Sequence, residues 1–304
     1  MSALKQIGEL GPLVLLHRWA LRRPYVLGEQ LFVDYSDVTV RWGVMRLDLA
    51  AQRVSEELVP ECELGHPQDG SAIPVADGKA SLAVYVAEQG EALCVWDKQR
   101  RSWRIYRQAP EHSAITVGAT PGSPWVSHLF ETAVGAQLEL INVEEPALGR
   151  TVPVGAFTGA TAVAVNNTLS HVAVAHGGAL SCARLEGGTE YAWPLDGPTY
   201  RLWFAEDDLA IFRLTRGAVT LHQFGGSVAR FELPDFRPIS IDLRSRSAFF
   251  LNDRAREYVE LDLSSGRARN SGQLPHGFIT VDLTARRLAA FSWEQWTLKV
   301  FELP

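Results

Sequence analysis

The residues of this chain that could support catalysis or hold a metal are its eight histidines, its three cysteines and its scattered carboxylates. Zinc and disulfide sites need such residues in pairs or at short spacing. Cys62, Cys94 and Cys182 lie far apart and include no C-x-x-C pair. The sequence therefore predicts free thiols in a reducing compartment, with Cys94 and Cys182 buried in strands as small apolar residues. No metal and no cofactor is expected.

Two histidines, His171 and His176, lie five residues apart in one apolar run. Because side chains alternate across a strand, this spacing directs them to opposite sides of a sheet, which disfavours a shared metal. The chain has no G-x-S-x-G, H-E-x-x-H, G-x-G-x-x-G or phosphate-loop pattern. The glycine-rich segment 118–125 lacks a lysine, so we interpret it as a turn between strands rather than a phosphate cradle. No catalytic residue is predicted.

One segment, "KQRRSWRIYR" at 98–107, interleaves four arginines with Trp103 and Tyr106. Cations beside aromatic faces are typical of single-stranded nucleic-acid binding. The alternative is a solvated outer strand with the hairpin that precedes it. A formal net charge of -6 repels phosphate at long range and favours this alternative. No nucleic-acid partner is expected.

Strand-length apolar runs recur along the chain with a period that settles near roughly forty residues, the range of propeller blades. Their apolar residues alternate with period two, and Gly, Asn and Asp separate them as hairpin turns require. First runs are 71–77, 114–120, 160–166, 200–206, 239–245 and 279–285; second runs are 31–36, 82–87, 125–130, 172–177, 209–214, 248–253 and 288–293; third runs are 44–49, 92–97, 137–142, 180–185, 219–224, 258–263 and 298–303. More polar fourth runs follow at 53–58, 103–108, 190–195 and 228–233.

Three apolar strands and a wetter fourth strand are typical of a propeller blade, whose inner strands are covered by neighbouring blades. The sequence predicts an all-β fold, a single seven-bladed β-propeller of four-stranded antiparallel blades in one domain, 1–304. The expected blades cover approximately 24–60, 71–109, 114–155, 160–195, 199–234, 238–274 and 279–304. The last unit stops after three runs, so the N-terminal segment 11–19, "GPLVLLHRW", is expected to complete it and remove an exposed edge.

One unit resembles a WD40 repeat. Gly65-His66 opens it, "ADGKASLAVYVA" at 76–87 matches the hairpin of the first two strands, and "LCVWD" at 93–97 closes the third. The other units lack both dipeptides, although Asp48 and Asp262 repeat the final Asp. The chain therefore resembles a divergent WD40-like propeller, and this resemblance implies a rigid platform for proteins and peptides.

Propeller geometry brings the loops between second and third strands to one face, together with the loops that join successive blades. Arginine and aromatic residues, which are enriched at binding hot spots, occur in the first kind of loop. The predicted partner-binding residues are Trp42, Arg216, Arg254, Arg256, Trp293 and Trp296. Alternatively, the tryptophans cap the apolar end of the channel.

Two classes of function stay open. The first is a non-catalytic protein–protein interaction platform, a subunit or adaptor of a larger intracellular bacterial assembly. The second is a lactonase-like propeller hydrolase with a metal in the central channel. The first is favoured because catalytic motifs are absent and because the WD40-like propellers that the chain resembles are mostly platforms for proteins and peptides. His17 and Arg18 interrupt the apolar N-terminal stretch, so we expect no signal peptide. We accordingly expect a cytoplasmic protein with no membrane partner. As a propeller, it is expected to be monomeric.

Overall fold

The structure is a computed structural model. It describes residues 4–11, 18–37, 42–58, 73–75, 80–87, 90–97, 100–107, 116–119, 123–132, 135–155, 157, 159–205, 209–274, 277–283, 285–292 and 294–304. These residues form 28 β-strands and one short 3-10 turn at Pro146–Leu148. The dipeptide Gly65-His66 and the cysteine Cys62 lie outside the described residues.

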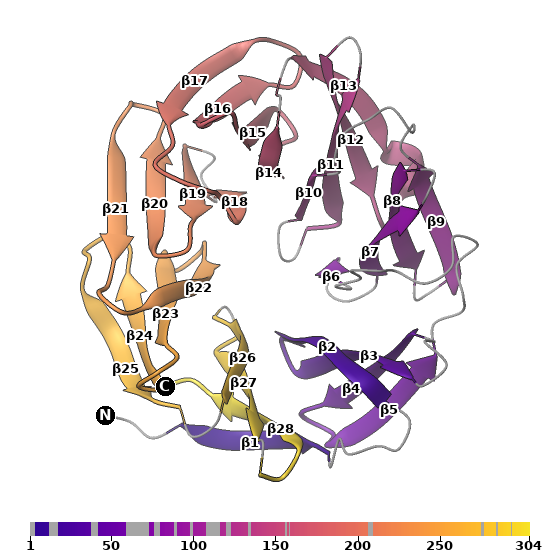
Figure 1. The fold of residues 1–304 in the computed structure, drawn as a ribbon, viewed down its shortest axis with the longest axis vertical. Coiled ribbons are helices and arrows are strands. Elements are labelled where there is room, and N and C mark those ends of the chain that lie inside the picture. The colour runs from indigo at the N-terminus through magenta and orange to yellow at the C-terminus, as the bar shows by residue number, and fades with distance from the viewer. Residues whose placement is uncertain are drawn as a thin grey trace. The chain divides into compact units, whose positions relative to one another are not determined.

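The strands form seven four-stranded antiparallel sheets, most of them consecutive along the chain (Figure 1). Their bounds are β2 (Arg18–Leu27), β3 (Gln30–Asp37), β4 (Trp42–Asp48) and β5 (Arg53–Leu58); β6 (Ile73–Val75), β7 (Ala80–Ala87), β8 (Gly90–Asp97) and β9 (Ser102–Arg107); β10 (Thr116–Ala119), β11 (Trp125–Thr132), β12 (Gly135–Asn142) and β13 (Arg150–Gly155); β14 (Ala160–Val165), β15 (His171–His176), β16 (Ala179–Arg184) and β17 (Thr189–Pro194); β18 (Arg201–Phe204), β19 (Ala210–Leu214), β20 (Ala218–Gln223) and β21 (Val228–Glu232); β22 (Arg237–Asp242), β23 (Ser247–Asn252), β24 (Glu257–Asp262) and β25 (Ala268–Gln273); and β26 (Gly277–Asp282), β27 (Arg287–Ser292), β28 (Thr297–Glu302) and β1 (Lys5–Leu10).

The seventh sheet is completed from the start of the chain, as predicted, but by a different segment. β1 pairs antiparallel with β28, with Lys5 opposite Glu302 and Leu10 opposite Leu298 (Figure 1). The prediction that segment 11–19 completes this sheet is therefore wrong, and the last two residues of that segment are the first two of β2. An outer strand is half solvated. β1 suits this position because Lys5, Gln6 and Glu9 are exposed while Leu10 is buried.

The chain divides into two compact units, Met1–His66 with Phe231–Pro304, and Pro67–Arg230. In the first unit, apolar side chains of β26–β28 pack against those of β2–β4 on one side and β23–β24 on the other. In the second unit, three clusters join the consecutive sheets in the same way. Each sheet thus buries its faces against its sequence neighbours within a unit. That the whole chain is one domain stays a prediction.

The burial pattern explains the polarity difference between inner and outer strands. All five residues of β19 are buried, whereas four of the five residues of β21 are exposed. The fourth strand has no neighbour on its outer edge and meets solvent. The polar fourth runs are confirmed as outer strands at β5, β9, β17 and β21.

Carboxylate and amide side chains at the ends of third strands stabilise the turns that follow. Asp48 Oδ1 accepts hydrogen bonds from the backbone N–H groups of Ala50 and Ala51, and Asp262 Oδ1 does the same for Ser264 and Ser265. Such local bonds replace the sheet bonds that end there. The repeated Asp seen in the sequence therefore has a structural role at these two positions.

Candidate functional site

Turns between second and third strands carry the predicted partner-binding residues. Arg216 lies between β19 and β20, Arg254 and Arg256 lie between β23 and β24, and Trp296 lies between β27 and β28. All four side chains are exposed. Trp42 is the first residue of β4, but its side chain lies outside the described part, and Trp293 lies outside the described residues altogether.

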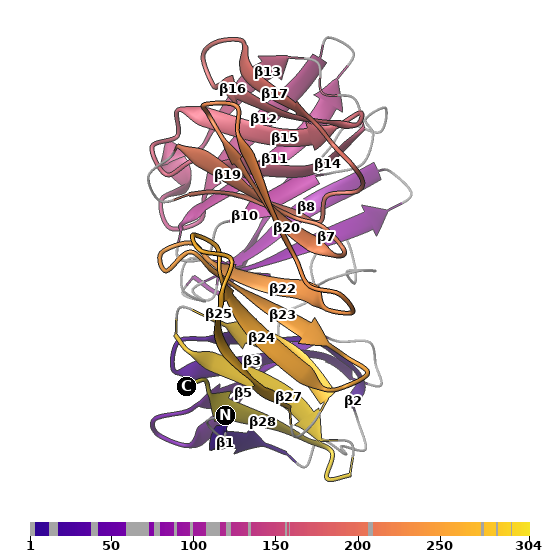
Figure 2. The ribbon, with the colours of Figure 1, turned by 90° about the vertical axis from the view of Figure 1, so that its left-hand side faces the viewer.

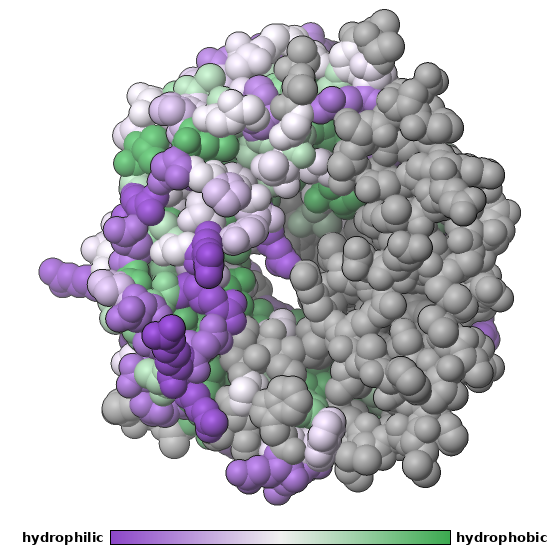
Figure 3. Space-filling view, viewed as in Figure 1, coloured by the Kyte–Doolittle hydropathy of each residue, from purple (hydrophilic) through white to green (hydrophobic). Residues whose placement is uncertain are grey.

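Arg254, Arg256 and Trp296 belong to the same unit, on two sheets that share a core. We call these three residues the 254–296 surface. Arg216 belongs to the other unit, so its membership of one basic patch stays a prediction. Hydrophilic side chains gather over β22–β25 in the view of Figure 3.

The backbone of the β23–β24 turn is fixed by several hydrogen bonds. Asn252 Oδ1 accepts from the N–H groups of Arg254 (3.1 Å) and Ala255 (3.0 Å). The N–H of Leu274 donates to the Arg256 carbonyl at 2.7 Å. The turn is thus held by its own asparagine and by the end of β25, which fixes where the two arginine side chains start.

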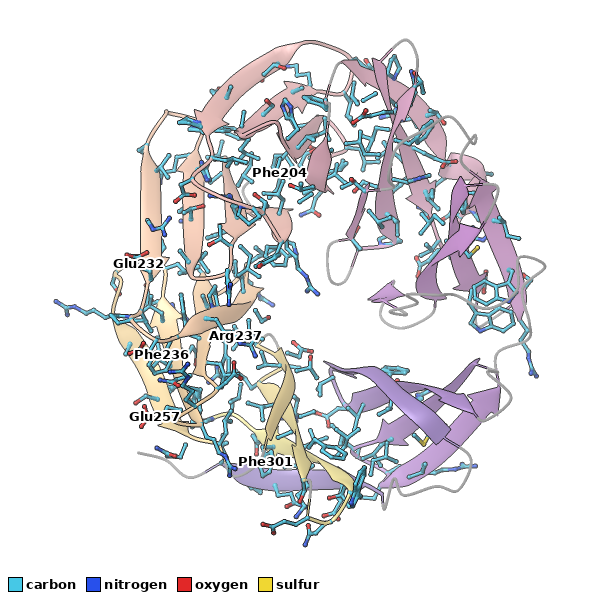
Figure 4. All side chains as sticks on the ribbon, viewed as in Figure 1. Phe204, Glu232, Phe236, Arg237, Glu257 and Phe301 are labelled. Atoms are coloured by element: carbon cyan, nitrogen blue, oxygen red, sulfur yellow. The ribbon has the colours of Figure 1, made fainter. Side chains whose placement is uncertain are left out.

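The carboxylate nearest to Arg254 in sequence, that of Asp253, forms an ion pair with Arg237. Arg237, labelled in Figure 4, donates from Nε and Nη2 to the two oxygens of Asp253 at 2.5 and 3.0 Å. Glu257 accepts instead from Gln273 at 3.0 Å. Within the described residues, neither Arg254 nor Arg256 forms an ion pair. The turn therefore presents two guanidinium groups whose neighbouring carboxylates are engaged elsewhere.

Trp296 is the aromatic member of the 254–296 surface. Its side chain is 48% exposed, and one ring contact, edge-on to Phe291 at 6.0 Å, anchors it. Its φ of 54° is in the left-handed region, which costs a non-glycine residue about 1 kcal/mol or more. Arg256 shares this conformation at φ 54°, as do six other described non-glycine residues. Some of these, such as Gln52 and Arg286, hydrogen-bond to the protein through their side chains, whereas Arg256 has no such bond to a described residue.

The basic and aromatic segment 98–107 is largely engaged inside its own unit. Arg100 pairs with Asp97 at 3.2 Å, and Arg104 donates to the Val143 carbonyl of the next sheet at 2.6 Å. The Trp103 ring lies 5.2 Å from that of Trp96. Burial raises the pKa of Tyr106 above its usual value. The outer-strand interpretation is confirmed by the position of β9 at the edge of its sheet.

The described histidines and cysteines are separate from one another. His171 contacts Glu190 at 3.3 Å, whereas His176 contacts Ser181 at 2.9 Å. Cys94 and Cys182 are confirmed as buried free thiols, and burial raises the pKa of Cys182 to about 12. In the part of the chain that the structure describes, no three His, Cys, Asp or Glu side chains form a group that could hold a metal. Across the same residues, no helix has the length and apolarity that a membrane crossing demands.

A polar network that sequence reasoning missed joins the buried Arg213 of β19 to the segment between β17 and β18. Arg213, only 1% exposed, donates to Asp196 Oδ1 (2.7 Å), Thr199 Oγ1 (2.8 Å) and the Gly197 carbonyl (2.5 Å). The Arg213 guanidinium lowers the pKa of Asp196. The available signal was an arginine inside the apolar run "LAIFRL", which demands a buried partner.

His222, which is 2% exposed, makes the stability of the β18–β21 sheet sensitive to acid. Burial, assisted by the charge of Arg213, lowers the pKa of His222 to about 4. Between pH 6.5, near the pKa of this histidine in the unfolded chain, and pH 4, near its pKa in the folded protein, only the unfolded chain binds a proton there. The free energy of unfolding therefore falls as the pH falls. We expect the cost to reach about 3 kcal/mol by pH 4.

This expectation is tested by urea unfolding of the wild type and the His222→Gln variant at pH 7 and pH 4.5. The variant is expected to lose less unfolding free energy on acidification than the wild type. His171→Gln, at a half-buried surface histidine, is the matched control. Equal losses in the wild type and both variants would show that His222 does not contribute.

Two solved structures resemble this chain over almost its whole length. The Cps50 (Swd1) β-propeller domain of Myceliophteria thermophila is 11% identical with a TM-score of 0.59, and the match covers 95% of this chain and 99% of that one. Raptor of Chaetomium thermophilum is 10% identical with a TM-score of 0.62, and the match covers 99% of this chain but 28% of that one. No protein-family profile and no curated protein matches the sequence.

This likeness, together with the seven four-stranded antiparallel sheets, shows that the chain has a β-propeller fold. The predicted fold class is confirmed, and it no longer depends on the single WD40-like repeat. At such low identity the likeness concerns the fold alone, because propellers support many unrelated functions.

Proposed function

We propose that this protein is a non-catalytic docking platform and that its 254–296 surface binds a protein partner. The observation that carries the proposal is the pair of unpaired guanidinium groups, within the described residues, on the hydrogen-bonded β23–β24 turn. A half-exposed tryptophan lies on the neighbouring sheet. Arginine and tryptophan are the residue types that dominate binding hot spots, and a fixed turn loses little entropy on binding.

We further propose that the protein is a cytoplasmic monomer that acts as a subunit or adaptor of a larger bacterial assembly. A net charge of -6 supports a protein partner over nucleic acid or an anionic membrane surface. The composition, rich in Ala, Arg and Leu, supports the bacterial source.

The docking proposal predicts that the triple variant Arg254→Ala, Arg256→Ala, Trp296→Ala loses its partner. Hot-spot truncations cost about 2 kcal/mol each, so three should weaken binding by more than about a hundredfold. The tagged protein is purified at native expression level, and stoichiometric partners are quantified by mass spectrometry. The matched control, Arg53→Ala, Arg150→Ala, Leu148→Ala, removes two exposed arginines and one exposed apolar side chain elsewhere. A partner retained in full by the triple variant contradicts the proposal.

A further inference from the structure

The ends of β22–β25 away from the 254–296 surface carry a second concentration of arginines. Two turns meet there, residues 243–246 between β22 and β23 and residues 263–267 between β24 and β25. Figure 2 shows β23 and β24 side by side, and each has six residues, so the two ends lie about 20 Å apart. The four arginines at this end are Arg244, Arg246, Arg267 and Arg269, which we call the arginine surface.

Hydrogen bonds join the two turns into one structure. The N–H of Leu263 donates to the Arg246 carbonyl at 2.8 Å. Arg269 reaches across from β25 and donates from Nη2 to the Ser245 carbonyl, also at 2.8 Å. Three of the arginines therefore emerge from a single cross-linked pair of turns, and the fourth, Arg269, lies at the start of β25 beside them.

The two carboxylates of these turns, Asp242 and Asp262, are engaged within the turns. Asp262 accepts from the Ser264 and Ser265 N–H groups and binds Arg269 through Oδ2, and this arginine holds the pKa of Asp262 below its usual range. Asp242 Oδ1 accepts from the N–H of Arg244 at 3.0 Å. Residues 242–246 and 262–269 include four arginines and two aspartates, a formal charge of +2.

Two members of the arginine surface are available to a ligand. Arg244 and Arg267 are exposed, and neither forms an ion pair within the described residues. The hydroxyl groups of Ser264 and Ser265 lie in the same pair of turns, and both serines are exposed. The neighbouring Glu260 carboxylate pairs with Arg286 at 2.7 Å, so its negative charge is already engaged there.

We infer that the arginine surface docks an extended acidic segment of a protein partner. Guanidinium groups bind carboxylates through two parallel charge-assisted hydrogen bonds, and arginine clusters are a recurrent means of recognising acidic motifs. The residues of the two turns include no aromatic side chain on which a base could stack, which disfavours single-stranded nucleic acid. The site is separate from the 254–296 surface, and either can fail without the other.

The test is fluorescence anisotropy of a labelled octaglutamate peptide titrated with the full-length protein at low salt. The Arg244→Gln, Arg267→Gln variant is expected to bind at least about tenfold more weakly, because two charge-assisted contacts are lost. The matched control, Arg53→Gln, Arg150→Gln, changes the net charge equally elsewhere and is expected to bind within about twofold of the wild type. Thermal melting verifies that both variants are folded.

Four results would overturn the inference. If octaglutamate does not bind at low salt, the arginine surface is not a site for acidic segments. If both double variants bind the peptide equally weakly, the binding reflects net charge alone. An octathymidine oligonucleotide that binds more tightly than octaglutamate, and loses affinity in the Arg244→Gln, Arg267→Gln variant, reassigns the surface to nucleic acid. If a labelled octaglutamine peptide, which carries no side-chain charge, binds as strongly as octaglutamate, recognition does not depend on charge.

Discussion

Replacing Gly118 by alanine is expected to destabilise the protein by at least about 3 kcal/mol. Gly118 lies inside β10, where the neighbouring sheet approaches it closely. An added Cβ would lie 2.1 Å from the Val163 carbonyl oxygen and 2.5 Å from Ser127 Oγ. The closer contact is backbone, so it cannot be relieved by a change of rotamer. A hydrogen bond from Thr116 Oγ1 to the Ala160 carbonyl at 2.9 Å joins β10 and β14, which further restricts adjustment.

Urea unfolding at pH 7 measures the effect of Gly118→Ala. The matched control is Gly217→Ala, in the β19–β20 turn, where an added Cβ meets no atom within 4 Å and φ is not in the left-handed region. This control is expected to change the unfolding free energy by less than about 1 kcal/mol. Similar stabilities for the two variants would show that β10 and β14 do not approach each other as described.

Removing the carboxylate of Asp196 is expected to cost about 2–4 kcal/mol. Asp196→Ala leaves the guanidinium of Arg213, which is 1% exposed, without its charge partner. An uncompensated buried charge is strongly destabilising, whereas replacing a buried pair by apolar residues is often neutral. The Asp196 carboxylate is itself half exposed, which keeps the expected cost below that of a fully buried pair.

A double-mutant cycle measures this coupling by chemical denaturation. Asp196→Ala combined with Arg213→Met is expected to recover part of the stability that Asp196→Ala alone loses, because no buried charge remains. Arg230→Ala removes only the exposed partner of Asp196 and is expected to cost under about 1 kcal/mol. If Asp196→Ala and Arg230→Ala reduce the unfolding free energy equally, the buried guanidinium of Arg213 does not depend on Asp196 as its charge partner.

The strand order could be predicted because each strand has a local signal. Alternation of apolar and polar residues sets which face is buried, and Gly, Asn and Asp mark the turns. The run 53–58 coincides with β5, and the run 190–195 differs from β17 by one residue at each end. Six of the seven sheets consist of four strands that follow one another along the chain, so local hairpin signals also indicate which strands pair.

The closing strand was misplaced because its partner is distant in sequence. The more apolar segment 11–19 looked the better strand, but the vacant position was an outer edge, where one face meets water. β1 meets that requirement through Lys5 and Glu9, whereas 11–19 has no such alternation. Polarity, rather than apolar content, was the informative signal for this strand.

The placement of the candidate site residues followed from strand order, but their partners did not. Once β23 and β24 are recognised, Arg254 and Arg256 must lie in the turn between them. The ion pair of Arg237 with Asp253 depends on the register of β22 and β23, and the approach of Gly118 to Val163 depends on the packing of two strands that are not consecutive. The arginine surface escaped sequence analysis because its members come from two separate turns and β25.

The most direct test of the docking platform is site-specific photo-crosslinking from the β23–β24 turn in living cells. A benzophenone amino acid is placed at Ala255, which is exposed in that turn, and at Glu186, which is exposed in the β16–β17 turn. The account predicts one dominant crosslinked protein from position 255 that is absent from position 186 and is lost when Arg254, Arg256 and Trp296 are replaced by alanine. No crosslink from position 255, or the same crosslinked protein from both positions, would contradict it.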